Sequence, residues 1–158
     1  MSELEVRIVQ LEPIRVASAY GFGPNPEEQA WDKLLTWAKS KGLLELSPDR
    51  PRSYRLFGFN NPSPSAGSPN YGYEQWMTVA SDVQPEGDIA IKEFPGGLYA
   101  VTRFQGLSKI GKVWEQLAAW CDTSQYKFAH HQWLEELLSS PLEPDLEKYI
   151  FDLYLPIY

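Results

Sequence analysis

Two adjacent glutamates, Glu135 and Glu136, lie in a short segment that has the residue types of a β-strand. Neighbouring side chains of a strand point to opposite faces, so Glu135 shares a face with Trp133 and Leu137, while Glu136 points the other way. Apolar surroundings penalise an ionised carboxylate, so such a group either takes up a proton near neutral pH or recruits a positive charge. The first state suits general acid–base chemistry, and the second suits recognition of a cation with help from aromatic rings.

A purely structural role for Glu135 is the alternative, in which it lies at a solvated strand edge or pairs with Arg55 or Arg103. Other catalytic patterns are absent from the sequence, which has no Gly-rich phosphate loop, Cys-x-x-Cys, Gly-x-Ser-x-Gly or His-Glu-x-x-His. His130 and His131 are the only histidines, and adjacent positions on a strand point apart, which disfavours a shared metal site. We therefore expect neither a metal nor a cofactor.

Composition limits the class of protein. The 158 residues carry a net charge of -7, which disfavours direct nucleic-acid binding because a phosphate backbone attracts clustered Lys and Arg. Cys121 is the only cysteine, so a disulfide framework is excluded and a reducing compartment fits. The sequence shows no basic-then-apolar leader and no apolar run of the roughly 20 residues that a membrane-spanning helix needs. We expect a soluble, cytoplasmic protein with no membrane partner.

The chain repeats itself. Trp31-x-x-Leu34-x-x-Trp37 recurs as Trp114-x-x-Leu117-x-x-Trp120, 83 positions later, and the flanking residues 6–23 and 89–106 align at the same shift without a gap. Residues 73–79 match residues 151–157 at a shift of 78, which aligns Glu74 with Asp152. Self-similarity of this kind indicates one supersecondary unit used twice. We place the two halves at residues 1–82 and 83–158 of a single domain.

Each copy of the tryptophan motif lies in a predicted amphipathic helix. The first helix should begin at Asn25-Pro26, with the Asn25 side chain as its cap, and the second should be capped by Ser108. The three-and-four spacing predicts one buried stripe on each helix. These stripes are Ala30, Trp31, Leu34, Trp37 and Ala38 in the first helix, and Val113, Trp114, Leu117, Trp120 and Cys121 in the second.

Strand-like runs complete each half. Aromatic and β-branched residues predict strands over residues 52–59 and 73–79, and over residues 132–138 and 149–157. Each half is therefore β-α-β-β. We expect an α+β fold in which two such modules pair about a pseudo-two-fold axis, forming an antiparallel sheet with two main helices and a central groove.

Aromatic residues are the expected walls of a binding site. Trp76 and Tyr154 occupy matching positions in the closing strands of the two halves, and each offers a broad apolar face with one polar group. Trp31 and Trp114 are further candidates, although a tryptophan at helical spacing also suits an ordinary core.

The chain resembles the GyrI-like (gyrase-inhibitor-like) effector-binding domain over its whole length. The features that carry the resemblance are the tandem β-α-β-β order, the closing residues 151–157, and the segment Leu134-Glu135-Glu136-Leu137-Leu138-Ser139-Ser140-Pro141. In that family the strand usually reads Glu-x-Tyr with a proline four residues after the tyrosine. Here Glu135 takes the glutamate position, Leu137 replaces the tyrosine and Pro141 keeps the proline.

The resemblance implies a pocket for aromatic or cationic amphipathic small molecules, with Glu135 as the counter-charge. We therefore expect a stand-alone binding protein for drugs or toxins, whose ligand-binding residues are Glu135, Trp133, Leu137, Trp76, Tyr154, Trp114 and Trp31. One alternative implied by the family is a hydrolase that opens the cyclopropane of DNA-alkylating toxins, with Glu135 as the catalytic residue. Another is a protein-interaction module with DNA gyrase as the partner.

Overall fold

The computed structural model describes residues 4–44, 54–61 and 66–158. The chain divides into two compact units, which are described separately. The first unit is Ile14–Phe94, and the second combines Met1–Pro13 with Pro95–Tyr158. Both units are built from antiparallel strands and one main helix, so the fold is of the α+β class.

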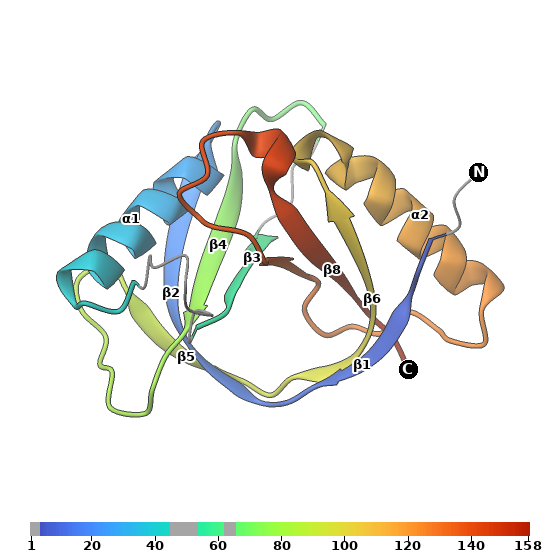
Figure 1. Ribbon diagram of the computed structural model, residues 1–158, viewed down its shortest axis with the longest axis horizontal. Coiled ribbons are helices and arrows are strands. Elements are labelled where there is room, and N and C mark those ends of the chain that lie inside the picture. The colour runs from blue at the N-terminus through green and yellow to red at the C-terminus, as the bar shows by residue number, and fades with distance from the viewer. Residues whose placement is uncertain (1–3, 45–53, 62–65) are drawn as a thin grey trace. The chain divides into compact units, whose positions relative to one another are not determined.

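The first unit has four strands in the order β3-β4-β2-β5, and α1 packs against β2 and β4 (Figure 1). Its elements along the chain are β2 (Ile14–Gly23), α1 (Pro26–Ser40), β3 (Leu56–Asn60), β4 (Tyr71–Thr78) and β5 (Ala90–Phe94).

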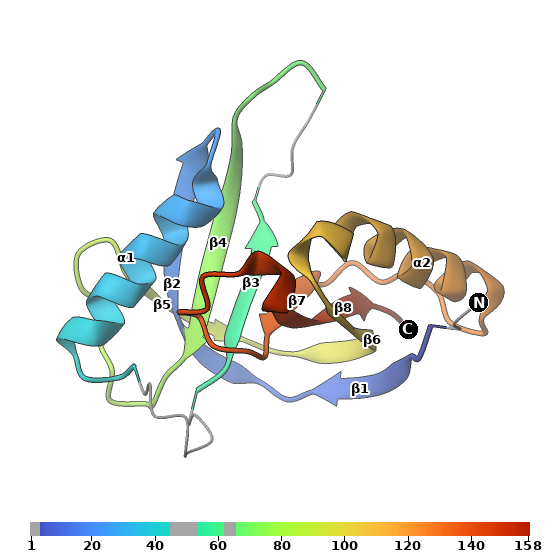
Figure 2. The same cartoon turned by 45° about the horizontal axis from the view of Figure 1, so that its top comes forward.

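The second unit has four strands in the order β1-β6-β8-β7, and α2 packs against β6 and β8 (Figure 2). Its elements are β1 (Arg7–Leu11), β6 (Gly97–Gln105), the 3₁₀ turn η1 (Leu107–Lys109), α2 (Ile110–Thr123), β7 (Leu134–Leu137), the 3₁₀ turn η2 (Leu146–Lys148) and β8 (Ile150–Pro156). The order β-α-β-β thus occurs once in each unit, as the sequence predicts.

The two halves of the sequence repeat exchange their edge strands. In the sequence repeat, the consecutive pair β1 and β2 corresponds to the pair β5 and β6. Yet β1 does not pair with β2: it pairs with β6, while β5 pairs with β2. Each repeated strand therefore completes the unit of the opposite half, and for this reason the compact units divide near residues 13 and 94.

A glycine on β2 sets the distance between α1 and the sheet. A β-carbon added at Gly21 would lie 2.2 Å from the Pro26 carbonyl oxygen and 2.9 Å from the Gln29 β-carbon. Gly21 therefore faces α1, and by alternation so do Ala17 and Ala19, both fully buried. Ser18 and Tyr20 point to the opposite, helix-free face of this unit.

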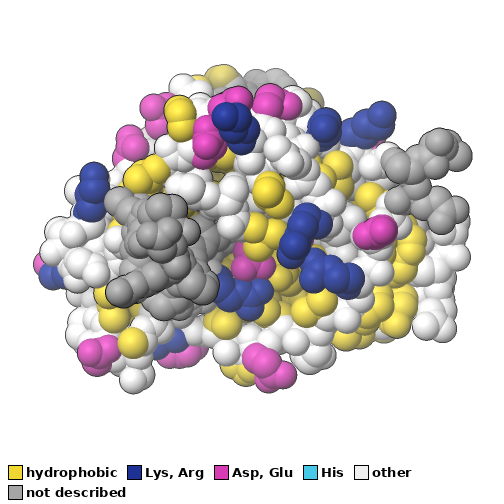
Figure 3. Space-filling model, viewed as in Figure 1, with side chains coloured by type: hydrophobic (Ala, Val, Ile, Leu, Met, Phe, Trp, Pro, Cys, Tyr) yellow, Lys and Arg dark blue, Asp and Glu magenta, His cyan; other side chains and the backbone are white. Residues whose placement is uncertain are grey.

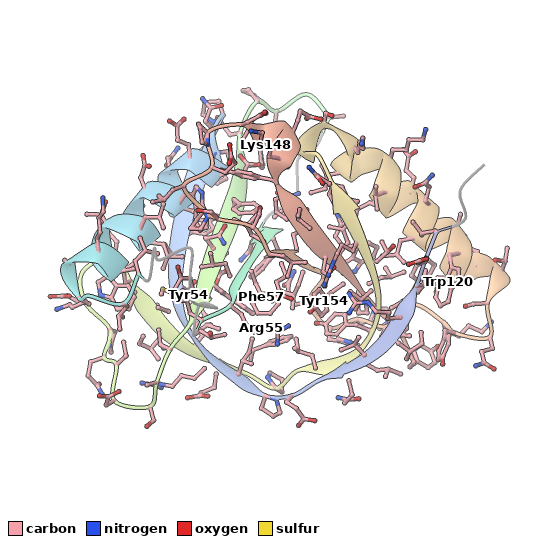
Figure 4. All side chains as sticks on the ribbon, in the orientation of Figure 1. Tyr54, Arg55, Phe57, Trp120, Lys148 and Tyr154 are labelled. Carbon is pink, nitrogen blue, oxygen red and sulfur yellow. The ribbon has the colours of Figure 1, made fainter. Side chains whose placement is uncertain are left out.

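The predicted buried stripes of the two helices are wrong for three of their four tryptophans. Among the predicted stripe tryptophans only Trp37 is buried, whereas Trp31, Trp114 and Trp120 stay half-exposed because they flank the stripe rather than lie at its centre. Figure 4 labels Trp120 on α2.

The predicted helix caps are also corrected. Within the described residues, the Asn25 side chain makes no capping hydrogen bond. Ser108 lies inside η1 rather than at the start of α2. There the Glu147 carboxylate accepts hydrogen bonds from the Ser108 backbone and hydroxyl, at 3.1 and 3.0 Å, so a distant element provides the polar contact at this helix entrance.

All four predicted strands exist. β3, β7 and β8 are shorter than predicted, whereas β4 begins two residues earlier and ends one residue earlier than the predicted segment 73–79. Residues 52–53 of the first predicted strand, and residues 62–65 of the predicted loop that follows it, lie outside the described residues.

No helix among the described parts of the chain combines the length and the apolar character required to cross a membrane.

Candidate functional site

Glu135 lies on β7 and faces α2. The Trp114 Nε1 group on α2 donates a hydrogen bond to Glu135 Oε2 at 3.1 Å, which fixes the direction of the carboxylate. The Trp114 ring in turn contacts the Trp133 ring, with centroids 5.2 Å apart and planes at 47°. The structure therefore brings Glu135, Trp114 and Trp133 together, and buried Leu137 shares their face of the strand.

The aromatic surface continues beyond Trp133. Phe128 stacks on Trp133 with a centroid distance of 6.5 Å and an interplanar angle of 8°. Trp133 is 41% exposed and Phe128 is 39% exposed, so both rings offer apolar area to a ligand. We call Glu135, Trp114, Trp133 and Phe128 the Glu135 cluster. A carboxylate beside open aromatic rings attracts organic cations through both charge and ring faces.

Glu136 points to the opposite face of β7 and is buried. The Tyr154 hydroxyl donates to Glu136 Oε1 at 2.6 Å, and the Tyr154 ring packs edge-on against Tyr99 at 5.3 Å. Figure 4 labels Tyr154 on β8. Burial raises the pKa of the Tyr99 hydroxyl well above its ordinary value, so Tyr99 stays a neutral donor to the Gln132 carbonyl. Tyr154 thus lies on the face away from Glu135.

Trp76, a further predicted wall residue, is buried in the first unit. Its ring lies between Phe59 at 4.9 Å and Phe94 at 5.3 Å, and its Nε1 group donates to Glu74 Oε1 at 2.8 Å. Trp31 is a half-exposed residue on the flank of α1. These two residues belong to a different unit from the Glu135 cluster.

Glu74 is a buried carboxylate surrounded by donors. Besides Trp76, it accepts hydrogen bonds from Ser18 at 2.7 Å, from Asn61 at 3.3 Å and from the Lys92 ammonium, with which it forms an ion pair. Burial raises the pKa of Glu74, but the hydrogen bonds from Lys92, Trp76 and Ser18 and the charge of Lys92 outweigh burial. The pKa therefore lies below its ordinary value of 4.5.

Acid is expected to destabilise the protein through Glu74. Because the pKa of Glu74 is lower in the folded than in the unfolded state, the carboxylate contributes stability that is fully present above pH 4.5 and is lost as the pH falls below it. Urea unfolding across the acid range should show a steeper decline for the wild type than for Glu74→Gln. Glu93→Gln, which alters a carboxylate that is 70% exposed, should follow the wild type. Parallel declines for wild type and Glu74→Gln would contradict this assignment.

Asp152 is the counterpart of Glu74 in the second unit. Glu74 pairs in register with Tyr20, and Asp152 pairs in register with Arg103, at positions 83 residues apart on β2 and β6. Asp152 is also buried, and its partners are the guanidinium groups of Arg7 and Arg103. The sequence alignment of Glu74 with Asp152 therefore corresponds to a structural equivalence.

Sequence reasoning missed the residues that pair with these buried acids. Lys92 lies on β5 and Arg7 on β1, and both strands reach their partners through the strand exchange. No motif connects either cation to its carboxylate, because the pairing depends on which strand completes which unit. Phe128 was missed for a different reason: it lies in an irregular segment, where the sequence has no periodic pattern that predicts ring contacts.

Within the described ranges, no group of three or more His, Cys, Asp and Glu side chains is arranged to hold a metal.

A family model described as "GyrI-like small molecule binding domain" matches residues 4–158. A search of curated proteins finds no match to this chain.

Solved structures share the fold at low sequence identity. A hydrolase from Listeria innocua has a TM-score of 0.70 at 14% identity, with 100% of this chain and 94% of that chain covered. The EcmrR C-terminal domain has a TM-score of 0.73 at 13% identity, with 98% of each chain covered. SAV2435 bound to tetraphenylphosphonium has a TM-score of 0.54 at 15% identity, with 98% of this chain and 94% of that chain covered.

Proposed function

We propose that this chain, which belongs to the GyrI-like small-molecule-binding domain family, captures aromatic, positively charged small molecules at the Glu135 cluster. The observation that carries the proposal is the contact of a half-buried carboxylate with an aromatic surface: Trp114 donates to Glu135 and packs on Trp133, which remains 41% exposed.

The aromatic rings supply the apolar part of recognition. The stacked pair of Phe128 and Trp133 presents two nearly parallel rings, at 8° to one another, and Trp114 meets Trp133 at 47°. Rings at two inclinations accommodate a ligand whose own aromatic groups point in several directions. Ring contacts of this kind contribute about 0.5–1.5 kcal/mol each beyond the area that they bury.

The carboxylate supplies the preference for positive charge. Glu135 is not fully solvated, because the indole of Trp114 covers one oxygen, so its interaction with a nearby cation is screened less than at an open surface. A cation placed over Trp133 gains a further attraction from the ring face, of about 0.5–1 kcal/mol at an exposed site. Neutral molecules of the same shape gain neither the attraction to the Glu135 carboxylate nor the attraction of a cation to the Trp133 ring face.

Tetraphenylphosphonium is a suitable probe, since it joins one positive charge to four aromatic rings and is the ligand in the SAV2435 structure. We expect it to quench the tryptophan fluorescence of the protein in a saturable manner. Glu135→Gln should weaken binding roughly tenfold, equivalent to about 1.4 kcal/mol, because the amide keeps the shape of the side chain and removes its charge. Isothermal titration calorimetry gives the same comparison without relying on fluorescence.

The matched control is Glu115→Gln, which removes an equal charge from an exposed position on α2, next to Trp114. This variant should bind tetraphenylphosphonium as the wild type does. Equal affinity of Glu135→Gln and the wild type would reject the site. A cyclopropane-bearing alkylating drug, followed by mass spectrometry, distinguishes binding from hydrolysis: recovery of intact drug supports capture, and ring opening that Glu135→Gln abolishes supports an enzyme.

A further inference from the structure

A second cluster of charged groups lies on the face of the second unit that points away from Glu135. Asp152 and Leu153 are neighbours on β8, and Leu153 pairs with Glu135, so alternation places Asp152 on the opposite face. Arg7 Nη2 donates to Asp152 Oδ2 at 2.7 Å. Arg103 donates from Nε to Oδ1 at 2.9 Å and from Nη2 to Oδ2 at 3.2 Å. One carboxylate therefore orients two guanidinium groups.

The acid is buried and the two cations are not. The side chain of Asp152 is 4% exposed, whereas those of Arg7 and Arg103 are 52% and 58% exposed. A guanidinium carries five N–H donors, and the contacts with Asp152 use only some of them. Among the described residues, Arg7 and Arg103 have no other hydrogen-bonding acceptor, so their remaining donors are available to solvent or to a ligand.

Neutralisation of Asp152 does not by itself require two cations. In the first unit, one ammonium, from Lys92, together with neutral donors satisfies the equivalent Glu74. Arg7 and Arg103 together carry one positive charge more than Asp152 alone, and Glu136, which pairs in register with Asp152, is a second acid on this face. The charge of Glu136 acts on Arg103 through space. Glu136 accepts a hydrogen bond from Tyr154, and the hydrogen bonds of both guanidinium groups go to Asp152.

We propose that Arg7 and Arg103, held by Asp152, form a binding site for a small oxyanion, namely a phosphate or carboxylate group. Guanidinium groups are planar and bind such anions through paired N–H donors, which favours arginine over lysine for this purpose. Asp152 already restricts the conformations of both side chains before the anion arrives, so less conformational entropy is lost on binding. An anion site must be accessible, and both arginine side chains are more than half exposed. Figure 3 shows Lys and Arg side chains in dark blue on one face of the molecule.

The test uses the full chain labelled with ¹⁵N, and the probes are inorganic phosphate and acetate at constant ionic strength, with chloride as the reference. The Nε–Hε signals of Arg7 and Arg103, assigned by comparing variants, report binding at the site itself. We expect saturable shifts of both signals at millimolar anion. Arg7→Gln and Arg103→Gln should each weaken the affinity at least tenfold, and each leaves one arginine to neutralise Asp152. Arg103→Lys, which keeps the charge, should restore only part of the affinity.

Lys112→Gln is the control, since it removes the same charge from an exposed position of α2. This variant should bind the anions as the wild type does. Saturation with phosphate alone, with acetate alone or with both identifies the anion and supports the site. Shifts that grow linearly, that chloride reproduces, or that Lys112→Gln reduces as much as the arginine variants do would overturn the proposal. Thermal unfolding of each variant establishes that it is folded.

Discussion

Replacing Lys92 by methionine is expected to destabilise the protein by about 3 kcal/mol. Glu74 is 3% exposed at its side chain and pairs with the Lys92 ammonium, so the substitution leaves a buried carboxylate without its cation. Breaking such a pair by removing one partner is strongly unfavourable, because the desolvation penalty of the remaining ion is no longer offset. Three neutral donors, on Ser18, Asn61 and Trp76, stay in place and keep the loss from being larger.

Lys41→Met is the matched control for Lys92→Met. Lys41 pairs with Glu86 at 2.7 Å, but these side chains are 45% and 54% exposed. An exposed ion pair contributes less than about 1 kcal/mol. Urea unfolding of both variants measures the difference. A similar loss in the two variants would show that the burial of Glu74 does not set the strength of its ion pair.

Gly21→Ala is expected to destabilise the protein by about 2–3 kcal/mol. The added methyl would lie 2.2 Å from the Pro26 carbonyl oxygen and 3.1 Å from the Ala30 backbone nitrogen. Both neighbours are backbone atoms of α1, which do not rotate aside as a side chain does. The helix must therefore move away from β2, and the packing of its buried residues against the sheet is lost in part.

Gly111→Ala tests the same change where space is open. Gly111 lies in α2, and a β-carbon there meets no atom within 4 Å. Alanine is the better helix former by up to about 1 kcal/mol, so this variant should be slightly stabilised. Chemical denaturation of the two glycine variants should give changes of opposite sign. Stabilisation by Gly21→Ala would mean that α1 does not pack on β2 as described.

The sequence repeat predicted the local elements of this fold and the equivalence of Glu74 with Asp152. Both follow from residue order, because helical spacing and strand alternation are properties of consecutive residues. The repeat did not predict that β1 pairs with β6 and β5 with β2. That pairing joins strands far apart in the sequence, so no local pattern records it, and the partners Lys92 and Arg7 could not be predicted.

Alternation along β7 correctly assigned Glu135 and Glu136 to opposite faces, but it could not say which face a helix covers. The hydrogen bond from Trp114 answers that question, because it shows that α2 lies on the Glu135 side. The strand register explains why Tyr154 lies with Glu136, because Tyr154 pairs with Leu134, which shares a face of β7 with Glu136. Alternation along a strand thus defines two faces, and only the packing of the helix shows which of the two faces it covers.

The strand exchange has a consequence for the order in which the chain folds during synthesis. All strands of the unit Ile14–Phe94 lie in one continuous stretch of the chain, so this unit can fold as soon as β5 has left the ribosome. The residues of β1 are made earlier but must wait for β6, whose Val101 pairs with Arg7. Nascent chains therefore carry β1 unpaired until β6 has been made, which exposes this strand to wrong partners during that interval.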